Sequence, residues 1–349
     1  MNIHVFNPEH DIALASNLAN FTAPHAGRQL RADLGFLPAL WAKEGDVILV
    51  ENVEYAQKAW ERLRKRLVSR YGMGSTKWNN SFLWVEAPVS WDGITCISPW
   101  GWDKAIKHEL ERKGSPLAIM PSDEQLGTIR RLSHRQTAAH LLSLLQMEGT
   151  MGEAVFCETL EAVEQQQRLY RRIVLKAPWS SSGRGIRFVE GNLNDHQRGW
   201  LLNLLKSQGG VMVEPYYEKV KDFGMEFEST DEGIRYLGLS LFHTANGAYT
   251  GNILATEKVK LEKLSHYISV DLLDCIKESI CHSLQLEDYC GPFGVDMMVT
   301  KEGLHPCVEI NLRRTMGHVA LALSPTDDDI RNVMRIEYTS NYKLKINKL

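Results

Sequence analysis

The first 120 residues alternate short apolar runs with longer segments of helical periodicity. Apolar residues spaced three and four apart predict helices at 11–18, 53–70 and 102–112. Short runs of mainly apolar residues predict strands at 3–6, 46–50, 94–97 and 116–120. Because strands that alternate with helices are typical of βαβ units, we expect residues 1–120 to form an α/β domain around a mostly parallel sheet.

The pattern becomes α+β in the remaining chain. In the segment 121–208, helices are predicted at Ser122, at Ser133, at 160–168 and at 195–206, and strands at 155–156, 173–175 and 186–189. Ser122 and Ser133 each precede a glutamine by three residues, as in a capping box. A Gly209-Gly210 pair marks the expected boundary with a third segment, 209–349. Strands are predicted there at 211–215, 222–229, 234–243, 293–300 and 304–312, with one long helix at 263–284 and an unassigned basic tail at 338–349.

Charge, hydropathy and cysteine spacing narrow the classes of function. A net charge of −3 gives no support to a broad nucleic-acid surface. No apolar run approaches the roughly 20 residues of a membrane span, and no signal peptide is expected at the N-terminus. The six cysteines contain no C-x-x-C pair, so we expect them to be reduced, as in the cytoplasm.

The segment 173–189 carries the first candidate chemistry. Its apolar run ends at Lys176, and a Gly/Ser-rich loop separates that run from a second one at 186–189. A lysine at a strand end beside backbone N–H groups and hydroxyls can hold a polyphosphate. The alternative is a surface turn with a solvated lysine. The segment matches neither the G-x-x-x-x-G-K-[ST] phosphate loop nor the G-x-G-x-x-G dinucleotide fingerprint.

A predicted hairpin near the end of the chain carries a candidate metal site. If Glu302 and Gly303 form its tip, paired residue numbers sum to 605, and Asp296 lies directly across from Glu309. Alternation places Asn311 and Arg313 on the same face. Two facing carboxylates repel each other unless a cation lies between them, and oxygen ligands suit Mg²⁺ or Mn²⁺. The alternative is a solvated polar face of a half-exposed sheet.

These motifs, in this order, resemble the ATP-grasp superfamily, whose members include D-alanine–D-alanine ligase, glutathione synthetase and biotin carboxylase. The similarity extends over about residues 133–318. It implies an N-terminal α/β domain (1–120) followed by two α+β lobes (121–208 and 209–349) that clamp a nucleotide. The residues that match the nucleotide-binding positions are Arg135, Lys176, Ser181, Ser182, Gly183, Glu214, Tyr216 and Asp222.

The resemblance also implies roles for these residues. Arg135 and Lys176 correspond to phosphate-binding cations, although the first of these positions is often lysine in the family. Ser181, Ser182 and Gly183 belong to a loop that closes over the phosphates, and the segment from Glu214 to Tyr216 corresponds to the linker at the adenine. Asp222 matches the acid at the ribose. Asp296, Glu309 and Asn311 match the magnesium ligands, and the E-x-N-x-R spacing places Arg313 at the reacting centre.

The implied activity is ATP-dependent ligation. A carboxylate substrate would become an acyl phosphate, with Lys176 and Arg313 as catalytic groups, and an amine such as an amino acid or peptide would displace phosphate. Two alternatives stay open: a kinase-like enzyme that stops at phosphorylation, and a non-catalytic nucleotide-binding protein. ATP and Mg²⁺ or Mn²⁺ are the expected cofactors. The expected partners are small molecules rather than nucleic acid or membrane, and a homo-oligomer is one open possibility.

Several positions have two interpretations. Glu214 could simply end a strand, Arg135 could be a helix-surface residue, and Arg314 competes with Arg313 for the catalytic role. His318 could be structural or functional. A polar segment (His243, Thr244, Asn246 and Asn252) could be a plain loop or a substrate loop. A second polar segment (Asn7, Glu9, His10 and Asp11) follows the first predicted strand and could bind substrate or cap a helix.

Overall fold

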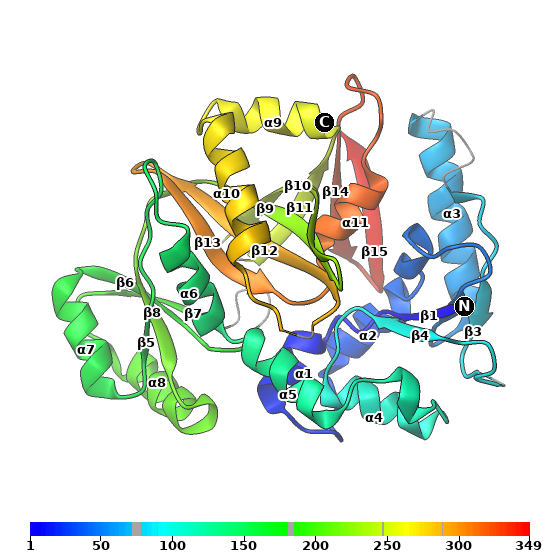
Figure 1. Ribbon diagram of the computed structural model, residues 1–349, viewed down its shortest axis with the longest axis horizontal. Helices are drawn as coiled ribbons and strands as arrows, with labels where there is room; N and C mark the ends of the chain where they lie inside the picture. The colour runs from blue at the N-terminus through cyan, green and yellow to red at the C-terminus, as the bar shows by residue number, and fades with distance from the viewer. Residues whose placement is uncertain (72–77, 89, 181–184, 246–247, 288) are drawn as a thin grey trace. The chain divides into compact units, whose positions relative to one another are not determined.

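The computed structural model describes residues 1–349 except 72–77, 89, 181–184, 246–247 and 288 (Figure 1). The chain forms two compact units. Unit 1 comprises Met1–Ile129, Gly251–Lys260 and Arg313–Leu349, and unit 2 comprises Arg130–Thr250 and Leu261–Leu312. Among the described residues, no helix has the length and apolar character needed to cross a membrane.

Unit 1 is organised around a sheet with the strand order β3-β2-β1-β4. Its strands are β1 (Asn2–Val5), β2 (Val47–Leu49), β3 (Leu83–Val85) and β4 (Cys96–Pro99). All of its strand pairs are parallel, which confirms the α/β prediction. The predicted strand at 116–120 is wrong, because Leu117–Ile119 forms the 3₁₀ helix η3 and Leu117 is 69% exposed. Sequence analysis missed β3, a three-residue strand with no fully buried residue.

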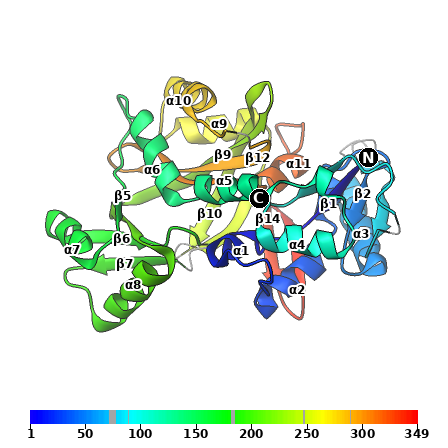
Figure 2. The same cartoon turned by 60° about the horizontal axis from the view of Figure 1, so that its bottom comes forward.

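Helices cover both faces of this sheet. The helices that lie wholly or mostly in unit 1 are α1 (His10–Ser16), α2 (His25–Leu34), η1 (Leu37–Leu40), α3 (Val53–Tyr71), α4 (Lys104–Arg112), α5 (Asp123–Leu132) and α11 (Met316–Leu323). Alternation along β1 directs Ile3 and Val5 toward a core shared with α4, and Phe6 just beyond the strand faces the other side. The helices α2 and α4 lie side by side in both views (Figures 1 and 2).

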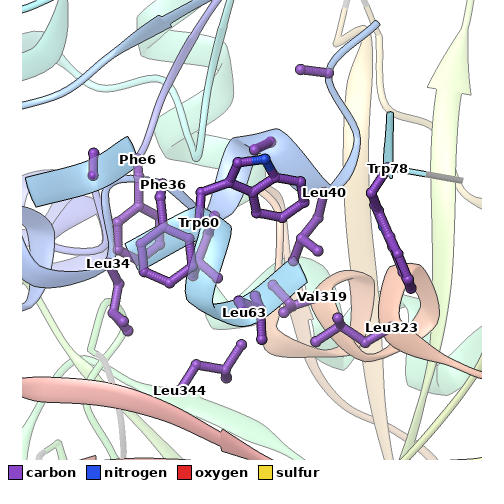
Figure 3. Packing of buried hydrophobic residues seen from close by; sticks show 14 of the residues in the cluster. Phe6, Leu34, Phe36, Leu40, Trp60, Leu63, Trp78, Val319, Leu323 and Leu344 are labelled. Carbon is purple, nitrogen blue, oxygen red and sulfur yellow. The ribbon is translucent and has the colours of Figure 1, made fainter. Parts of the chain in front are cut away.

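The larger core of unit 1 joins segments from both ends of the chain. Trp60 and Leu63 of α3 pack in one cluster with Val319 of α11 and Leu344 of β15 (Figure 3). The unassigned tail proves to be structured, because β14 (Asn332–Tyr338) and β15 (Tyr342–Lys348) form an antiparallel pair. The end of β11 (Ala248–Leu254) pairs with β14. The C-terminal segment is therefore part of the hydrophobic core of unit 1.

The smaller sheet of unit 2 has the order β5-β8-β6-β7. Its strands are β5 (Val155–Cys157), β6 (Arg172–Lys176), β7 (Ile186–Glu190) and β8 (Val211–Pro215). The helices α7 (Leu160–Leu169) and α8 (Asp195–Gln208) pack against one face of it (Figure 1). Although β8 follows the Gly209-Gly210 pair, it pairs with β5 and β6, so the sheet of the central segment extends past residue 208.

The second sheet of unit 2 is antiparallel, with β13, β12, β9 and β10 in that order. Its strands are β9 (Lys219–Thr230), β10 (Gly233–Ala245), β12 (Gly291–Thr300) and β13 (Leu304–Asn311). The helix α6 (Arg135–Leu144) precedes the small sheet in the chain. The single helix predicted at 263–284 is wrong: α9 (Glu257–Ser265) ends before α10 (Val270–Ser283), whose N-cap Ser269 accepts a hydrogen bond from the Asp271 amide.

Candidate functional site

One face of the small sheet carries a buried ion pair. Alternation sends Ile173 and Leu175 of β6 into the apolar core with α7 and α8, so Lys176 points to the opposite face. There its Nζ lies 2.5 Å from Glu214 Oε2 of β8. Lys176 is 5% exposed and Glu214 is 7% exposed, which excludes the solvated lysine of a surface turn. Two charges removed from water this completely require each other as partners.

Arg135 lies in the first turn of α6 and connects two strands of unit 2. Its Nε donates to the carbonyl oxygen of Ala177, just beyond β6 (2.9 Å). Its Nη2 lies 2.8 Å from Glu309 Oε1 of β13 and 3.2 Å from Ser180 Oγ. Arg135 is 7% exposed, so the interpretation as a helix-surface residue is wrong. A cation is thus held where the end of β6 approaches β13.

The start of α6 differs from the prediction in its capping residue. The N-cap is His134 rather than Ser133, and His134 Nδ1 accepts a hydrogen bond from the Gln136 amide (3.0 Å). The other predicted capping box is confirmed, since Ser122 and Gln125 exchange backbone and side-chain hydrogen bonds (2.8 and 3.1 Å).

Ser181, Ser182 and Gly183 of the predicted phosphate loop lie outside the described residues. The two ends of the loop are described, and the Ala177 amide donates to the Gly185 carbonyl oxygen (2.8 Å). A Cβ atom on Gly185 would lie 2.3 Å from Ser180 Cβ, so only glycine fits without a shift. The loop therefore begins and ends beside Arg135.

The hairpin register at the candidate metal site is confirmed. Asp296 pairs with Glu309, and Gly294 pairs with Asn311. Nearer the turn, Met298 pairs with His305, so β13 has two additional residues between His305 and Glu309. The predicted tip is wrong: Thr300 donates to the Gly303 carbonyl oxygen, which leaves Lys301 and Glu302 at the turn.

The irregularity in β13 has a physical reason at one of its residues. Pro306 lies between the two registers and has no amide hydrogen for a ladder bond, which favours a bulge. The bulge and the displaced tip together leave the predicted pairing of Asp296 with Glu309 intact.

The three predicted metal ligands share a face of this hairpin. Asp296, Glu309 and Asn311 are partly exposed, whereas Val295 and Ile310 are buried on the opposite face. Asn311 Nδ2 donates to Asp296 Oδ2 (3.0 Å), so the amide and this carboxylate are in direct contact. Within the described residues, no cluster of three or more His, Cys, Asp or Glu side chains could hold a metal. Two carboxylates and an amide suit Mg²⁺, which also takes phosphate oxygens as ligands.

A neighbouring strand adds a carboxylate that sequence analysis missed. Glu226 of β9 is 2% exposed and pairs with Gly294 in the register of β12. Gly224 pairs with Asp296, and a Cβ atom at Gly224 would lie 3.2 Å from Asp296 Oδ1 and 3.6 Å from Glu226 Oε1. The strict alternation of polar and apolar residues along β9 is the signal that could have identified Glu226.

Two buried groups of β13 have strongly shifted pKa values. Burial, together with the charge of Asp296, raises the pKa of the Cys307 thiol, so this cysteine stays protonated and is not a nucleophile. Burial lowers the pKa of His305 to about 4, so its ring is neutral at pH 7.

The residues predicted at the nucleoside occupy defined positions in unit 2. Asp222 Oδ2 lies 2.6 Å from Lys219 Nζ and accepts a hydrogen bond from Thr244 Oγ1 (2.5 Å). The Arg172 guanidinium carbon lies 3.8 Å from the ring centroid of Tyr216, and the Tyr216 amide donates to the Arg172 carbonyl oxygen (2.9 Å). Tyr216 is thus held against the start of β6.

The predicted polar loop around His243 belongs largely to two strands. His243 and Thr244 are in β10 and Asn252 is in β11, where it is 1% exposed. Asn246 lies outside the described residues. The plain-loop interpretation is therefore wrong for most of this segment.

Arg313 is placed differently from the prediction. Because β13 ends at Asn311, strand alternation does not extend to Arg313. In unit 1 its Nε and Nη2 each lie 2.7 Å from a different carboxylate oxygen of Asp11. The Arg314 guanidinium carbon lies 4.5 Å from the Trp41 ring centroid. His318 makes a structural contact, since its Nδ1 accepts from the Thr315 amide in a capping box at α11.

The polar segment after β1 forms hydrogen bonds to the loop between β4 and α4 in unit 1. Asn7 Nδ2 donates to the Gly101 carbonyl oxygen (2.8 Å), and His10 Nδ1 lies 3.1 Å from Asp103 Oδ2. Asp103 caps α4 by accepting from two backbone amides. A Cβ atom on Gly101 would lie 2.7 Å from the His10 ring, so glycine is required for this contact. None of these side chains caps α1, whose N-cap Glu9 makes no side-chain cap hydrogen bond.

Comparisons with known proteins bear on this arrangement. No family model matches the chain. A butirosin acyl-carrier protein–L-glutamate ligase from Niallia circulans is 24% identical over 228 residues, which cover 62% of this chain and 50% of that ligase. The chain therefore spans about half the length of this curated relative.

The solved structures that match align over a larger share of the chain than this relative does. N5-carboxyaminoimidazole synthetase from Staphylococcus aureus, complexed with ADP, aligns with a TM-score of 0.52 and 13% identity over 96% of this chain and 82% of that one. The biotin carboxylase domain of Hydrogenobacter thermophilus 2-oxoglutarate carboxylase, in complex with MgADP, aligns with a TM-score of 0.50 and 14% identity over 84% and 75%. The chain has the ATP-grasp fold. The fold that the motifs implied is thereby confirmed.

The ATP-grasp fold gives these contacts a common setting. Lys176, Glu214 and Arg135 belong to the small sheet and the helix before it, and Asp296, Glu309 and Asn311 to the antiparallel sheet. The ion pairs Lys176–Glu214 and Arg135–Glu309 both lie within unit 2.

Proposed function

We propose that this protein is a magnesium-dependent ligase that uses ATP to activate a substrate carboxylate as an acyl phosphate and joins it to an amine. One observation carries the proposal: two buried or half-buried ion pairs, Lys176 with Glu214 and Arg135 with Glu309, meet around the ends of the predicted phosphate loop. A buried cation beside carboxylates and a Gly/Ser loop suits a polyphosphate with its counter-ion.

The proposed roles combine these positions with the roles that the family resemblance implies. Lys176 and Arg135 would neutralise the outer phosphate oxygens, and Ser181, Ser182 and Gly183 would cover the phosphates. Glu214, Tyr216 and Asp222 would contact the nucleoside. Asp296, Glu309 and Asn311 would hold Mg²⁺, which supplies charge neutralisation for phosphoryl transfer. Glu309 would then exchange Arg135 for the metal as its partner.

The chemistry has two steps. A carboxylate oxygen of the substrate attacks the γ-phosphorus and ADP leaves, which gives the acyl phosphate. The amine nitrogen then attacks the acyl carbon, phosphate leaves, and the nitrogen loses a proton to form the amide. Arg313, which Asp11 holds through Nε and Nη2, would stabilise the charge on the acyl phosphate and on the tetrahedral oxyanion with its permanent positive charge.

The substrate proposal draws on the relative. The Niallia circulans ligase acts, by its name, on L-glutamate and an acyl-carrier protein. This supports an amino acid as one substrate here, with a small molecule or a carrier-bound group as the other. None of the six cysteines forms a disulfide in the described structure, which supports a reducing compartment such as the cytoplasm.

A phosphate-release assay tests the proposal. The purified protein would receive MgATP with pairs of amino acids, peptides and simple carboxylates. Release of phosphate that needs both an acid and an amine, with an amide product identified by mass spectrometry, is the expected result. A stable phosphorylated product without an amine would favour the kinase-like alternative. Nucleotide binding with no turnover of any pair would favour a non-catalytic protein.

A further inference from the structure

Unit 1 contains an open pocket of about 830 Å³ that the proposed nucleotide site does not use. Its lining includes Asn7 and Glu9 after β1, Glu51 after β2 and Asp103 after β4. The remaining walls come from α2, from α4 and from residues 19–23. Typical small-molecule sites in proteins have volumes of roughly 300–1,000 Å³, so the size suits a bound metabolite.

The position of this pocket in the sheet is one where ligands bind. Because β1, β2 and β4 are parallel, the residues that follow them meet at one edge. In the order β3-β2-β1-β4, the chain proceeds outward from β1 to β3 and then returns to place β4 on the other side of β1. Ligands of open α/β sheets bind at such a reversal of strand order, outside the carboxyl ends of the strands.

The inner part of the pocket has an excess of negative charge. Arg31 of α2 lies within salt-bridge distance of three carboxylates: 3.0 Å from Glu9, 3.3 Å from Glu51 and 2.7 Å from Glu109. Three carboxylates and one guanidinium carry a formal charge of −2, and Lys113, which lines a small cavity together with Arg31, Glu51 and Glu109, reduces this excess to −1. Glu9 Oε2 is buried and has no hydrogen-bond partner among the described residues, and burial raises the pKa of this carboxyl against the opposing effect of Arg31. A cationic group bound here would offset the excess.

Positive groups without ion-pair partners line the rest of the same pocket. Arg28 of α2 and Arg112 of α4 are both exposed lining residues, and neither makes a salt bridge to any described residue. His25, His108 and Lys113 are further basic residues of the lining. Arg28 lies one turn of α2 away from Arg31. The same helix therefore presents Arg28, which has no salt bridge to a described residue, beside Arg31, which three carboxylates surround.

We propose that this pocket binds a zwitterion, an amino acid or short peptide, with its ammonium group at Glu51 and Glu109 and its carboxylate at Arg28. Each charged end of the zwitterion would face side chains of opposite charge. A ligand with only one charged group would leave either the carboxylates or Arg28 without a ligand partner. As a binding site, the pocket stands on its own geometry. The assignment of its ligand as a substrate of the ligase rests on the proposed function.

Calorimetric titration of the full-length protein without nucleotide tests the site. The probes are the free L-amino acids and dipeptides, each compared with its N-acetylated and C-amidated forms. At least one free compound should bind, and each capped form should bind about tenfold or more weakly, the effect of losing one charge-assisted contact. Binding of no free compound, or equal binding of capped and free forms, would overturn the inference.

Three variants locate the site. Arg28→Gln should weaken binding of the free compound about tenfold or more but leave the affinity for its C-amidated form unchanged, and Glu51→Gln should do the same for the N-acetylated form. Arg66→Gln on the exposed face of α3 is the matched control and should bind as the wild type does. Arg28 and Glu51 are both exposed, so the melting temperatures of their variants should stay near that of the wild type. Variants that fold but bind normally would place the ligand elsewhere.

The same experiment separates this inference from the proposed ligase activity. If amine-dependent ATP turnover occurs but no zwitterion binds without nucleotide, the pocket assignment fails and the ligase proposal stands. If a zwitterion binds with the predicted dependence on Arg28 and Glu51 but no ATP is turned over, the ligase proposal fails and the pocket assignment stands.

Discussion

Arg135 Nη2 and Glu309 Oε1 lie 2.8 Å apart, which joins the first turn of α6 to the hairpin that carries the candidate metal ligands. In the proposed reaction these two side chains have different partners, because Arg135 would bind phosphate and Glu309 would bind Mg²⁺. The ion pair therefore competes with both. Nucleotide and metal should bind more tightly together than separately. Phosphate bound to Arg135 frees Glu309 for the metal, and metal bound to Glu309 frees Arg135 for the phosphate.

Glu309→Gln tests this competition. Loss of one carboxylate should raise the Mg²⁺ concentration needed for turnover, while removal of the charge that holds Arg135 should leave metal-free binding of a nucleotide analogue at least as tight as in the wild type. Activity as a function of Mg²⁺ and calorimetry with EDTA measure the two effects. Glu302→Gln, at the exposed tip of the same hairpin, is the control. Wild-type activity of Glu309→Gln at limiting Mg²⁺ would remove Glu309 from the metal site.

Lys176→Met should weaken MgATP binding by roughly 1–3 kcal/mol, the range for a lost charge-assisted contact. It should also destabilise the protein by about 3 kcal/mol or more, because Glu214 is left buried without its partner. The double variant Lys176→Met with Glu214→Gln should recover most of the stability but not the nucleotide affinity. Chemical denaturation and titration of a nucleotide analogue separate the two. A double variant that recovers both would make the pair purely structural.

The Asp11–Arg313 contact yields a third prediction. If Arg313 acts on the transition state, Arg313→Lys should lower kcat by ~10²-fold or more at nearly unchanged ATP affinity, about the effect of losing one oxyanion donor. Asp11→Asn keeps the guanidinium but weakens its fixed orientation, so it should lower kcat to a smaller extent. Arg314→Lys is the control. If the contact is only structural, Arg313→Lys and Asp11→Asn should lower the melting temperature alike and leave kcat unchanged.

His134 should make stability depend on pH. Burial, reinforced by Arg130 and Arg135, lowers its pKa to about 4 in the folded protein, and the unfolded value is near 6.5. The neutral ring that caps α6 through Nδ1 is therefore favoured by folding. This contribution is complete above pH about 6.5 and is lost as the pH falls to about 4. His134→Asn keeps an acceptor at the cap without titrating, so its melting temperature should fall less between pH 7 and pH 4.5. Equal declines would contradict the assignment.

The register of the β12–β13 hairpin shows how far local pattern extends. Asp296 was predicted to face Glu309 from a tip at Glu302 and Gly303, and the pairing is correct although that tip is wrong, because the two additional residues of β13 compensate for the displaced turn. Neither the tip nor the bulge near Pro306 was predicted, since the pattern of polar and apolar residues does not fix where a turn or an extra residue occurs. The single helix at 263–284 failed for a similar reason: Ser269 begins a new helix within a stretch that keeps helical periodicity throughout.

The partners of the charged residues were beyond the reach of the sequence. Lys176 could be placed at a strand end, but its pairing with Glu214 depends on β8 lying beside β6, 35 residues later in the chain. Arg313 was expected on the metal face from strand alternation, and the end of β13 at Asn311 cancels that argument. Glu9, Glu51 and Glu109 come from three separate segments, so only the folded sheet edge brings them to Arg31.

By itself, the sequence determined the alternation of strands and helices in unit 1, the antiparallel hairpin, and the identity of the residues with ligand chemistry. These follow from local periodicity, because backbone geometry repeats every two residues in a strand and every 3.6 in a helix. Tertiary structure alone decided which charges are buried, which partners neutralise them, and where a pocket opens at the carboxyl edge of the parallel sheet. Those properties depend on contacts between distant segments, and the energy of a charge depends on how far such contacts remove it from water.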